Sequence, residues 1–200
     1  NSIDPKEQPE IQELNKNMSQ RNAGVLDHIA AHMGDFIKVT LFFSTAQSMG
    51  ANFINTILEK YTEIIVKARP QTKPIMSILS NNYENSLVEA SFKIKKDALT
   101  HTNLSAQDFM KKFKQAITIA TIDPDRAMTH NKGLMNGVDA VLLATGQDYR
   151  AMNAAIHAYA SKSGSYSSLS YIKEDPDHLI FCTTLPYSLG VVGGITGVHP

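Results

Sequence analysis

Lys132 and Asp148 are the two residues whose types and spacing most suggest chemistry. They stand at opposite ends of the glycine-punctuated apolar stretch "KGLMNGVDAVLLATGQD". We expect Gly133 to interrupt a helix and Gly146 to end it, which places Lys132 at the start of a helical segment over 134–145. A lysine there faces the unfavourable end of the helix dipole, at a cost of about 0.3 kcal/mol, which is weak evidence that it is placed for a task.

The same two residues also have a purely structural explanation. If the stretch is one straight helix, Lys132 and Asp148 lie roughly 24 Å apart. They can then meet only if the chain bends or if a second subunit contributes one of them. Otherwise Lys132 is a solvated lysine and Asp148 caps the following helix, which is the common use of such an aspartate. Taken alone, the residues favour this structural explanation.

A second candidate site is the helix start in "SMGANFIN", residues 48–55. A predicted strand over 36–45 ends just before it, and a helix opens within a few residues. The free N–H groups and the partial positive charge at a helix N-terminus suit a phosphate, and Gly50 lets such a ligand approach the backbone closely. An ordinary helix start with a packing glycine explains the stretch equally well.

Two other patterns are weaker. His28 and His32 have the spacing of zinc ligands on a helix, but no glutamate stands beside the first histidine and no third ligand is evident. We therefore interpret them as surface histidines on a helix and expect no metal site. The glycines of "GVVGGITG" do not have the dinucleotide-binding spacing, and the nucleophile elbow G-x-S-x-G is absent from the sequence.

The elements that must position these residues alternate between helix and strand. We expect helices over 5–18, 53–65 and 106–120, and strands over 36–45, 74–80 and 86–94. Pro70 should end the second helix, and Ser105 should cap the third. This order predicts a small α+β sandwich over 36–120, with helices on a mostly antiparallel sheet.

A second unit begins near residue 121, which is the predicted domain boundary. Asp123 can cap a helix whose first position is Pro124, and the helical run reaches Thr145. An alanine-rich helix is predicted over 149–161, followed by alternating strands over 166–172, 178–186 and 190–198.

Composition excludes several classes of protein. The 200 residues carry 19 basic and 19 acidic side chains, which gives no electrostatic footprint for nucleic acid and no polybasic patch for a membrane. The single cysteine, Cys182, cannot form an internal disulfide and is interpreted as a small strand residue. No apolar run approaches the ~20 residues of a membrane span, and the polar N-terminus lacks a signal core. We therefore predict a cytoplasmic protein. The missing initial Met and the ending "GVVGGITGVHP" suggest a fragment.

Five stretches together resemble the bacterial, class II form of hydroxymethylglutaryl-coenzyme A reductase. They are "SMGANFINTILE", "ILSN", "TIDPDRAMTHNKGLMNG", "ATGQDYRAMNAAIHAYASKSGSY" and "LGVVGGITGVHP". The resemblance covers 22–200 in the family's order, and "HNKGLMNG" and "ATGQDYRA" stand at the family's mutual spacing. Residues 1–21 carry none of it.

The resemblance implies a reduction of hydroxymethylglutaryl-CoA to mevalonate and coenzyme A by two hydrides from NADPH or NADH, or the reverse reaction. It also implies a homodimer with active sites at the subunit interface. The implied fold is α+β and has three parts. A linker or large-domain helix (1–24) precedes a small, non-Rossmann nicotinamide-binding domain (25–120), and part of a larger α+β substrate-binding domain (121–200) follows.

The resemblance also implies roles for individual residues. Lys132 would stabilise the oxyanion of the thioester carbonyl and supply a proton. Asp148 would tune and orient this lysine, and Asn136 would support the same network. Arg126 and Thr129 would hold the hydroxymethylglutaryl end, whose carboxylate suits a guanidinium. The implied cofactor-binding residues are Gln47, Met49, Gly50, Ala51, Asn52 and Asn81.

The sequence departs from the family at three points. Gln47 stands where the family often has aspartate, which leaves both NADH and NADPH as candidates. The family's catalytic glutamate and thiolate-protonating histidine have no match, and we expect them before residue 1 and after Pro200, so the chain alone should be inactive. The alternative is a non-catalytic reductase-like module that binds nucleotide or CoA, or only dimerises. An unrelated α+β binding domain would require the spaced motifs to be coincidental.

Overall fold

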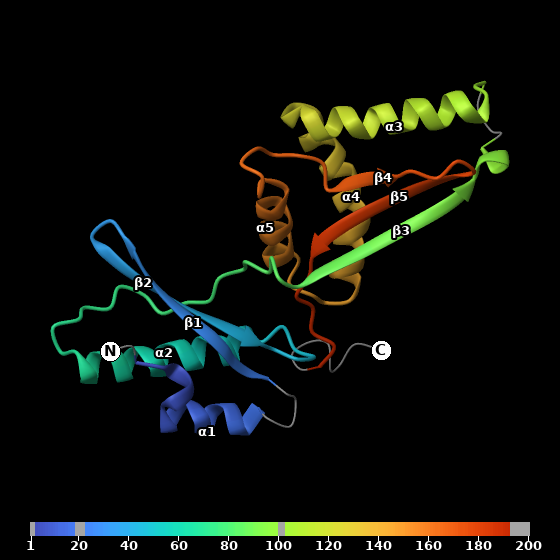
Figure 1. The fold of residues 1–200 in the computed structure, drawn as a ribbon. Helices are drawn as coiled ribbons and strands as arrows, with labels where there is room; N and C mark the ends of the chain where they lie inside the picture. Colours follow the sequence, from blue (N-terminus) through green and yellow to red (C-terminus); the bar gives the residue numbers. More distant parts are fainter. Residues whose placement is uncertain (1–2, 19–22, 100–102, 193–200) are drawn as a thin grey trace. The chain divides into compact units, whose positions relative to one another are not determined.

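The computed structural model describes residues 3–18, 23–99 and 103–192 (Figure 1). The chain forms two compact units. Unit one comprises Asn1–Ser80 and Leu189–Val198, and unit two comprises Asn81–Ser188 and His199–Pro200. The elements of unit one are η1 (Pro5–Glu7), α1 (Pro9–Met18), β1 (Gly24–Met33), β2 (Phe36–Ser44) and α2 (Ala51–Ala68). The elements of unit two are β3 (Leu87–Lys95), η3 (Lys96–Ala98), α3 (Ala106–Ile122), α4 (Pro124–Ala144), α5 (Tyr149–Ala160), β4 (Ser170–Lys173) and β5 (His178–Pro186).

Unit one is built on an antiparallel hairpin of β1 and β2, covered on one face by α1 and α2 (Figure 1). Helix α2 buries Ile57, Tyr61 and Ile64, whose spacing places them on one stripe of the helix. Ile11 of α1 is 0% exposed and joins the same cluster. Ile11 lies in the segment 1–24, which was predicted to be a linker or a helix of the large domain, and it contributes to the core of unit one.

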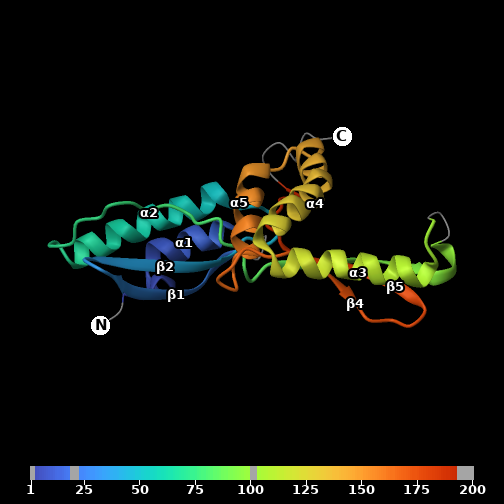
Figure 2. The same cartoon turned by 90° about the horizontal axis from the view of Figure 1, so that it is seen from above.

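Unit two is built on an antiparallel sheet with the strand order β3-β5-β4. Helix α3 runs alongside this sheet (Figure 2), and Phe113 of the helix meets Phe181 of β5 with ring centroids 6.2 Å apart. Phe92 of β3 stacks on the same Phe181 ring at 5.0 Å. Cys182 is fully buried on β5, which confirms its interpretation as a small strand residue.

Several local predictions are confirmed. The fold is mixed helix and antiparallel sheet, and strands occur at 36–44, 87–95 and 178–186. The Ser105 side chain accepts a hydrogen bond from the Asp108 N–H and caps α3. Asp123 caps α4 with Pro124 in the first turn. These features depend on capping residues and local periodicity, which act within a few positions of the sequence.

The predicted strand over 74–80 is wrong. This segment has no strand partner among the described residues, and Ile75 and Met76 are 73% and 74% exposed. This segment runs alongside α2 instead. Asn55 accepts a hydrogen bond from the Leu79 N–H at 2.9 Å, and Thr62 bonds to Ser77 at 2.6 Å. The predicted single sandwich over 36–120 is therefore wrong as well, because β2 and β3 belong to different sheets.

The helix predicted for His28 and His32 is also wrong. Both histidines lie on β1, which pairs with β2 as far as the turn at Gly34. The period-two pairing with β2 overrides the helical spacing of "HIAAH". Over the described ranges no three His, Cys, Asp or Glu side chains gather in a way that could hold a metal ion.

Helix α4 is continuous from Pro124 to Ala144, so the expected interruption at Gly133 is wrong. The face of α4 opposite Gly133 is buried, through Ala127, Asn131, Met135 and Leu142. This packing outweighs the helix propensity lost at Gly133 and Gly137, about 1 kcal/mol each. Both glycines face open space, with nothing within 4 Å of an added Cβ atom.

The compact units divide between Ser80 and Asn81, whereas the predicted boundary lay near residue 121. β3 pairs with β5 along its whole length, and α3 packs against α4 and β4, which places both elements in unit two. The predicted strand over 190–198 is absent at 190–192, and its remaining residues lie outside the described ranges. The assignment of a nicotinamide to residues 25–120 stays a prediction.

Candidate functional site

Four of the predicted site residues share one exposed face of α4. Arg126, Thr129, Lys132 and Asn136 lie within about 120° of one another around the helix axis. Gly133 falls inside the same stripe and is exposed. Because α4 is unbroken, it aligns a guanidinium, a hydroxyl, an ammonium and a carboxamide along about three turns. This arrangement offers several hydrogen-bond donors to a ligand rich in oxygen.

The backbone beside Lys132 is held from the buried side of α4. Asn131 is 0% exposed, its amide donates to the Ser167 carbonyl at 2.9 Å, and its oxygen accepts from the Leu169 N–H at 3.0 Å. His130 bonds through Nε2 to the Ser170 hydroxyl at 2.5 Å. Burial, and then the nearby Arg126 guanidinium, lower the pKa of His130, so its ring stays neutral at pH 7. The stripe is therefore fixed in position by the loop before β4.

Asp148 is the N-cap of α5. Its Oδ1 accepts a hydrogen bond from the Ala151 N–H at 3.0 Å, as the structural explanation predicts. Lys132 is exposed, and the helical rise from Lys132 to Ala144 alone is about 18 Å. The chain does not bend to bring Lys132 and Asp148 together. A meeting of the two through a second subunit stays a prediction.

Tyr83 bonds to a predicted cofactor residue, Asn81, and also experiences the charge of Asp148. The Tyr83 hydroxyl donates to the Asn81 Oδ1 at 3.0 Å. Burial and then the Asp148 carboxylate raise the pKa of Tyr83, while a hydrogen bond with Ser188 lowers it. Sequence reasoning missed Tyr83, because "NNYEN" has the composition of a turn and nothing in it points to residues 65 or more positions away.

In unit one, the start of α2 provides a cradle for an anion. Gly50 is the N-cap with φ +82°, and a Cβ atom there would lie 2.5 Å from Cγ2 of Thr45. No side chain caps this helix, and its first turn carries no acidic residue. The N–H groups of Ala51 and Asn52 are thus available to a ligand, which fits a nucleotide phosphate.

The loop before α2 is braced by residues that follow β5. The Val191 N–H donates to the Gln47 carbonyl at 2.8 Å. Gly190 is buried against Met49, where an added Cβ atom would lie 3.1 Å from the Met49 nitrogen. The predicted residues Gln47, Met49, Gly50, Ala51 and Asn52 therefore stand together at the start of α2, where residues 190–191 support the first two. Asn81, Lys132 and Asp148 belong to unit two.

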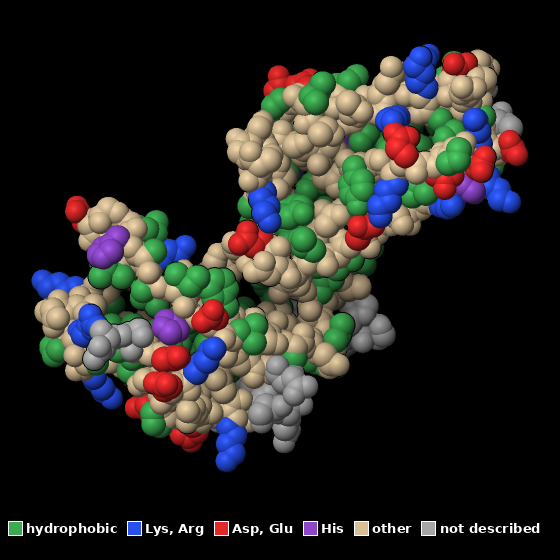
Figure 3. All heavy atoms as spheres, in the orientation of Figure 1, with side chains coloured by type: hydrophobic (Ala, Val, Ile, Leu, Met, Phe, Trp, Pro, Cys, Tyr) green, Lys and Arg blue, Asp and Glu red, His purple; other side chains and the backbone are tan. Residues whose placement is uncertain are grey.

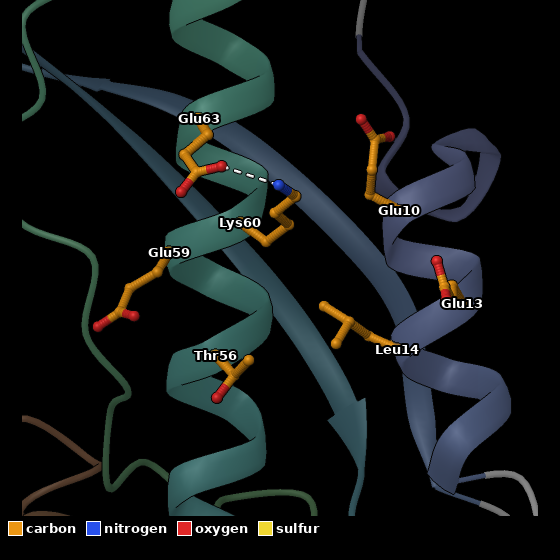
Figure 4. A pocket seen from close by; sticks show the side chains of 7 residues that line it. All are labelled: Glu10, Glu13, Leu14, Thr56, Glu59, Lys60 and Glu63. Atoms are coloured by element: carbon orange, nitrogen blue, oxygen red, sulfur yellow. Dashed lines mark hydrogen bonds and ion pairs between the residues drawn. The ribbon is translucent and has the colours of Figure 1, made fainter.

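A groove of 430 Å³ between α1 and α2 is a poor site for the expected ligands (Figure 4). Four glutamates, Glu10, Glu13, Glu59 and Glu63, line it together with a single lysine. Lys60 pairs with Glu63 at 2.9 Å. The surplus of carboxylates repels phosphate, and none of the predicted site residues lines this groove.

Charged side chains of both signs are mixed on the face of unit two that Figure 3 shows. Ion pairs join the strands and α3 to their neighbours, for example Lys93 with Asp175 at 3.2 Å and Lys114 with Glu174. Within the described ranges, the structure contains no helix that is both long and apolar enough to cross a bilayer.

Comparisons with known proteins identify the family of this chain. The family model for hydroxymethylglutaryl-coenzyme A reductase matches residues 2–200. The 3-hydroxy-3-methylglutaryl-coenzyme A reductase of Archaeoglobus fulgidus is 34% identical over 178 residues, which is 89% of this chain and 39% of that protein. A probable reductase of Borreliella burgdorferi is 32% identical over 187 residues, 92% of this chain and 43% of that protein.

Solved structures similar to this chain are also hydroxymethylglutaryl-coenzyme A reductases. The reductase of Streptococcus pneumoniae matches with a TM-score of 0.85 at 35% identity, covering 95% of this chain and 52% of that chain. A structure of the class II enzyme from the same organism, bound to NADPH in open conformations, matches at 36% identity with a TM-score of 0.85, covering 95% and 53%.

The chain thus spans about half the length of these relatives, or less. The family match begins at residue 2, so the expectation that residues 1–21 carry none of the resemblance is wrong. The resemblance to the class II form is confirmed by the solved structures. The chain belongs to the hydroxymethylglutaryl-coenzyme A reductase family.

Proposed function

We propose that the whole protein reduces hydroxymethylglutaryl-CoA to mevalonate and coenzyme A, using two equivalents of reduced nicotinamide, or runs the reverse reaction. The observation that carries this proposal is the alignment of Arg126, Thr129, Lys132 and Asn136 on one exposed face of α4, in a chain of the reductase family. In a cell this reaction would feed the mevalonate pathway of isoprenoid biosynthesis.

Lys132 is assigned the central role on α4. The first hydride adds to the thioester carbon, and the carbonyl oxygen takes up the negative charge and then a proton. The Lys132 ammonium stabilises this oxyanion and supplies the proton. The C–S bond of the resulting hemithioacetal then breaks, releasing coenzyme A as its thiol and leaving an aldehyde. A second hydride and a second proton convert the aldehyde to the alcohol.

The neighbours of Lys132 on the stripe hold and orient the substrate. Arg126 carries a guanidinium that pairs with the carboxylate of the hydroxymethylglutaryl group through two parallel hydrogen bonds. Thr129 offers a hydroxyl one turn away. Asn136 lies one turn beyond Lys132 and supports the hydrogen-bond network around the ammonium. Since nothing crowds Gly133, a substrate can lie close to the helix there.

Asp148 is assigned to the same network through a homodimer. Within one chain the two residues are separated by most of α4, so we propose that the lysine of one subunit meets the Asp148 carboxylate of its partner. Asp148 would then orient the ammonium and keep it charged until the proton is needed. This arrangement places each active site at the subunit interface.

The start of α2, in unit one, is assigned to a phosphate of the nicotinamide nucleotide. Asn81, in unit two, keeps its predicted role toward the nicotinamide. When bound, the reduced nicotinamide supplies the hydrides. The cradle fits a phosphate because its backbone N–H groups are uncapped and Gly50 keeps the approach open. A class II relative has been solved with NADPH. Gln47 is uncharged, so it lacks the carboxylate that would repel a phosphate on the ribose, and we propose that both NADH and NADPH are accepted.

The second candidate function is a reductase-like module that binds nucleotide or coenzyme A without turnover. Gln47 in place of the family's aspartate favours it. The predicted cytoplasmic location belongs to both candidates and stays a prediction.

The test is nicotinamide oxidation by the full-length protein with hydroxymethylglutaryl-CoA, with NADH and NADPH offered separately. We expect turnover in the wild type and at least a ~100-fold loss in Lys132→Met, since one oxyanion donor is worth that much. Lys111→Met, a change at an exposed lysine of α3, is the matched control and should keep full activity. A folded wild-type dimer that binds nucleotide without turnover would favour the non-catalytic module instead.

A further inference from the structure

Tyr83 lies where two predicted parts of the site converge, although no role was predicted for it. It is half-buried before β3, and its hydroxyl donates to the Asn81 Oδ1 at 3.0 Å. Asn81 is the residue of unit two assigned to the cofactor, and Asp148 is the assigned catalytic carboxylate. Asn81 contacts the Tyr83 hydroxyl directly, and the charge of Asp148 acts on the phenol electrostatically.

The backbone around Tyr83 is rigidly supported. The Ser86 N–H donates to the Tyr83 carbonyl at 2.8 Å, closing the turn before β3. Ser86 also exchanges hydrogen bonds with Tyr187, at 2.7 Å through its carbonyl and at 2.6 Å through its hydroxyl. The turn is thereby fastened to the end of β5. A phenol on such a support keeps its position relative to Asn81.

The direction of the hydrogen bond decides what Asn81 can do. A neutral phenol donates its proton to the carboxamide oxygen, so the oxygen end of Asn81 is turned toward Tyr83. Because the two ends of a carboxamide point in different directions, fixing the oxygen also fixes the NH₂ group. The NH₂ group of Asn81 is left to donate to an acceptor on a ligand.

We propose that Tyr83 is a positioning residue for Asn81. It holds the Asn81 side chain with its NH₂ group directed at the carboxamide oxygen of the nicotinamide. This inference rests on the proposed function, because it assumes that a nicotinamide nucleotide binds at Asn81. Burial and the Asp148 carboxylate raise the pKa of the Tyr83 phenol, so it remains a donor throughout the neutral range.

The first measurement is the affinity of the full-length protein for NADPH and NADH, followed by nucleotide fluorescence. Tyr83→Phe removes the hydroxyl and keeps the ring, so we expect the nucleotide Kd to rise about five- to tenfold, as for the loss of one neutral hydrogen bond. The affinity for coenzyme A should stay within about twofold, since a purely structural defect would weaken both ligands.

The matched control is Tyr166→Phe, which removes another half-buried hydroxyl of unit two. Its partner is Nδ1 of His157, at 2.8 Å, near the far end of α5 from Asp148. This variant should bind both nucleotides as the wild type does. Melting temperatures of both variants report whether either change disturbs the fold.

Two further variants test the mechanism at Asn81. Asn81→Asp keeps an acceptor for the Tyr83 hydroxyl but removes the NH₂ donor, so it should bind nucleotide at least as weakly as Tyr83→Phe. In an Asn81→Ala background, Tyr83→Phe should cause no further loss, because the two residues act through one contact.

Wild-type nucleotide affinity in Tyr83→Phe, tight binding by Asn81→Asp, or additive losses in the double variant would each overturn the proposal for Tyr83. In those cases the wild type still binds nucleotide and turns over substrate. A wild type that does neither would overturn the proposed function, and this inference with it.

Discussion

Replacement of Gly50 by alanine should damage both the stability of unit one and its nucleotide cradle. The added Cβ atom would lie 2.5 Å from Cγ2 and 3.0 Å from Cβ of Thr45, and the residue has φ +82°. The left-handed conformation costs alanine about 1 kcal/mol. Relief of the contact with Thr45 costs about 1–3 kcal/mol more, as for other overpacked sites. The free energy of unfolding should therefore fall by about 2–4 kcal/mol.

The assay is urea denaturation of the full-length protein, together with nucleotide titration. Two variants separate the causes. Thr45→Ser/Gly50→Ala removes the methyl group that clashes and should recover part of the loss, leaving the backbone term. Gly133→Ala places alanine in a helix interior with nothing within 4 Å, so it should stabilise the protein by about 0.5–1 kcal/mol. If Gly50→Ala were as stable as the wild type and bound nucleotide equally well, the account of this cradle would be refuted.

Four further outcomes are expected. Asn131→Ala should lower the free energy of unfolding by about 2–4 kcal/mol in urea titrations, because it removes the partner of the buried Leu169 N–H and of the half-buried Ser167 carbonyl; Asn136→Ala, at an exposed position, should stay within about 0.5 kcal/mol. Gly190→Ala should weaken nucleotide binding several-fold in fluorescence titrations, because its Cβ atom would press on the Met49 nitrogen at 3.1 Å; unchanged affinity would show that the brace at 190–191 does not shape the cradle. Asp148→Asn should keep the cap of α5 and the melting temperature while losing most turnover, whereas Asp148→Ala should lose turnover and about 1 kcal/mol of stability; full activity in Asp148→Asn would contradict a role for the charge. The His178 ring, the Asp177 N–H and then Lys93 hold the pKa of Asp175 well below its ordinary value, so this carboxylate stabilises the folded state above the unfolded pKa near 3.9 and loses that contribution as the pH falls further; urea midpoints at pH 7 and pH 3 should differ less in Asp175→Asn than in the wild type.

Local signals in the sequence were sufficient for much of the helical framework. The apolar spacing of α2 and the caps at Ser105 and Asp123 act over a few residues, and each appears where predicted. The prediction of a strand over 74–80 was wrong because the β-branched composition of this segment is typical of a strand, but the segment pairs with no other strand of the described residues. The predicted helix break at Gly133 was wrong because the stability of α4 comes mainly from its buried face, which packs against residues far along the chain.

The candidate site divides in the same way. The stripe on α4 and the cradle at Gly50 each lie within one short segment, so their residues could be named from motifs. The contact of Tyr83 with Asn81 is local, but the hydrogen bond of Tyr83 with Ser188 depends on the pairing of β3 with β5. This pairing joins residues about a hundred positions apart, as in the hydrogen bond from Ser86 to Tyr187. Periodicity and capping carry no information about such contacts.

The central claim is that Lys132 of one subunit and Asp148 of its partner serve one reductase active site. The most direct test mixes full-length Lys132→Met and Asp148→Asn, each inactive alone, under conditions that exchange subunits. Random exchange makes half of the dimers mixed, and one of the two sites in each mixed dimer regains both residues, so we predict about a quarter of the wild-type turnover. If mixed dimers form and remain inactive, the two residues do not act across the subunit interface, and the account is contradicted.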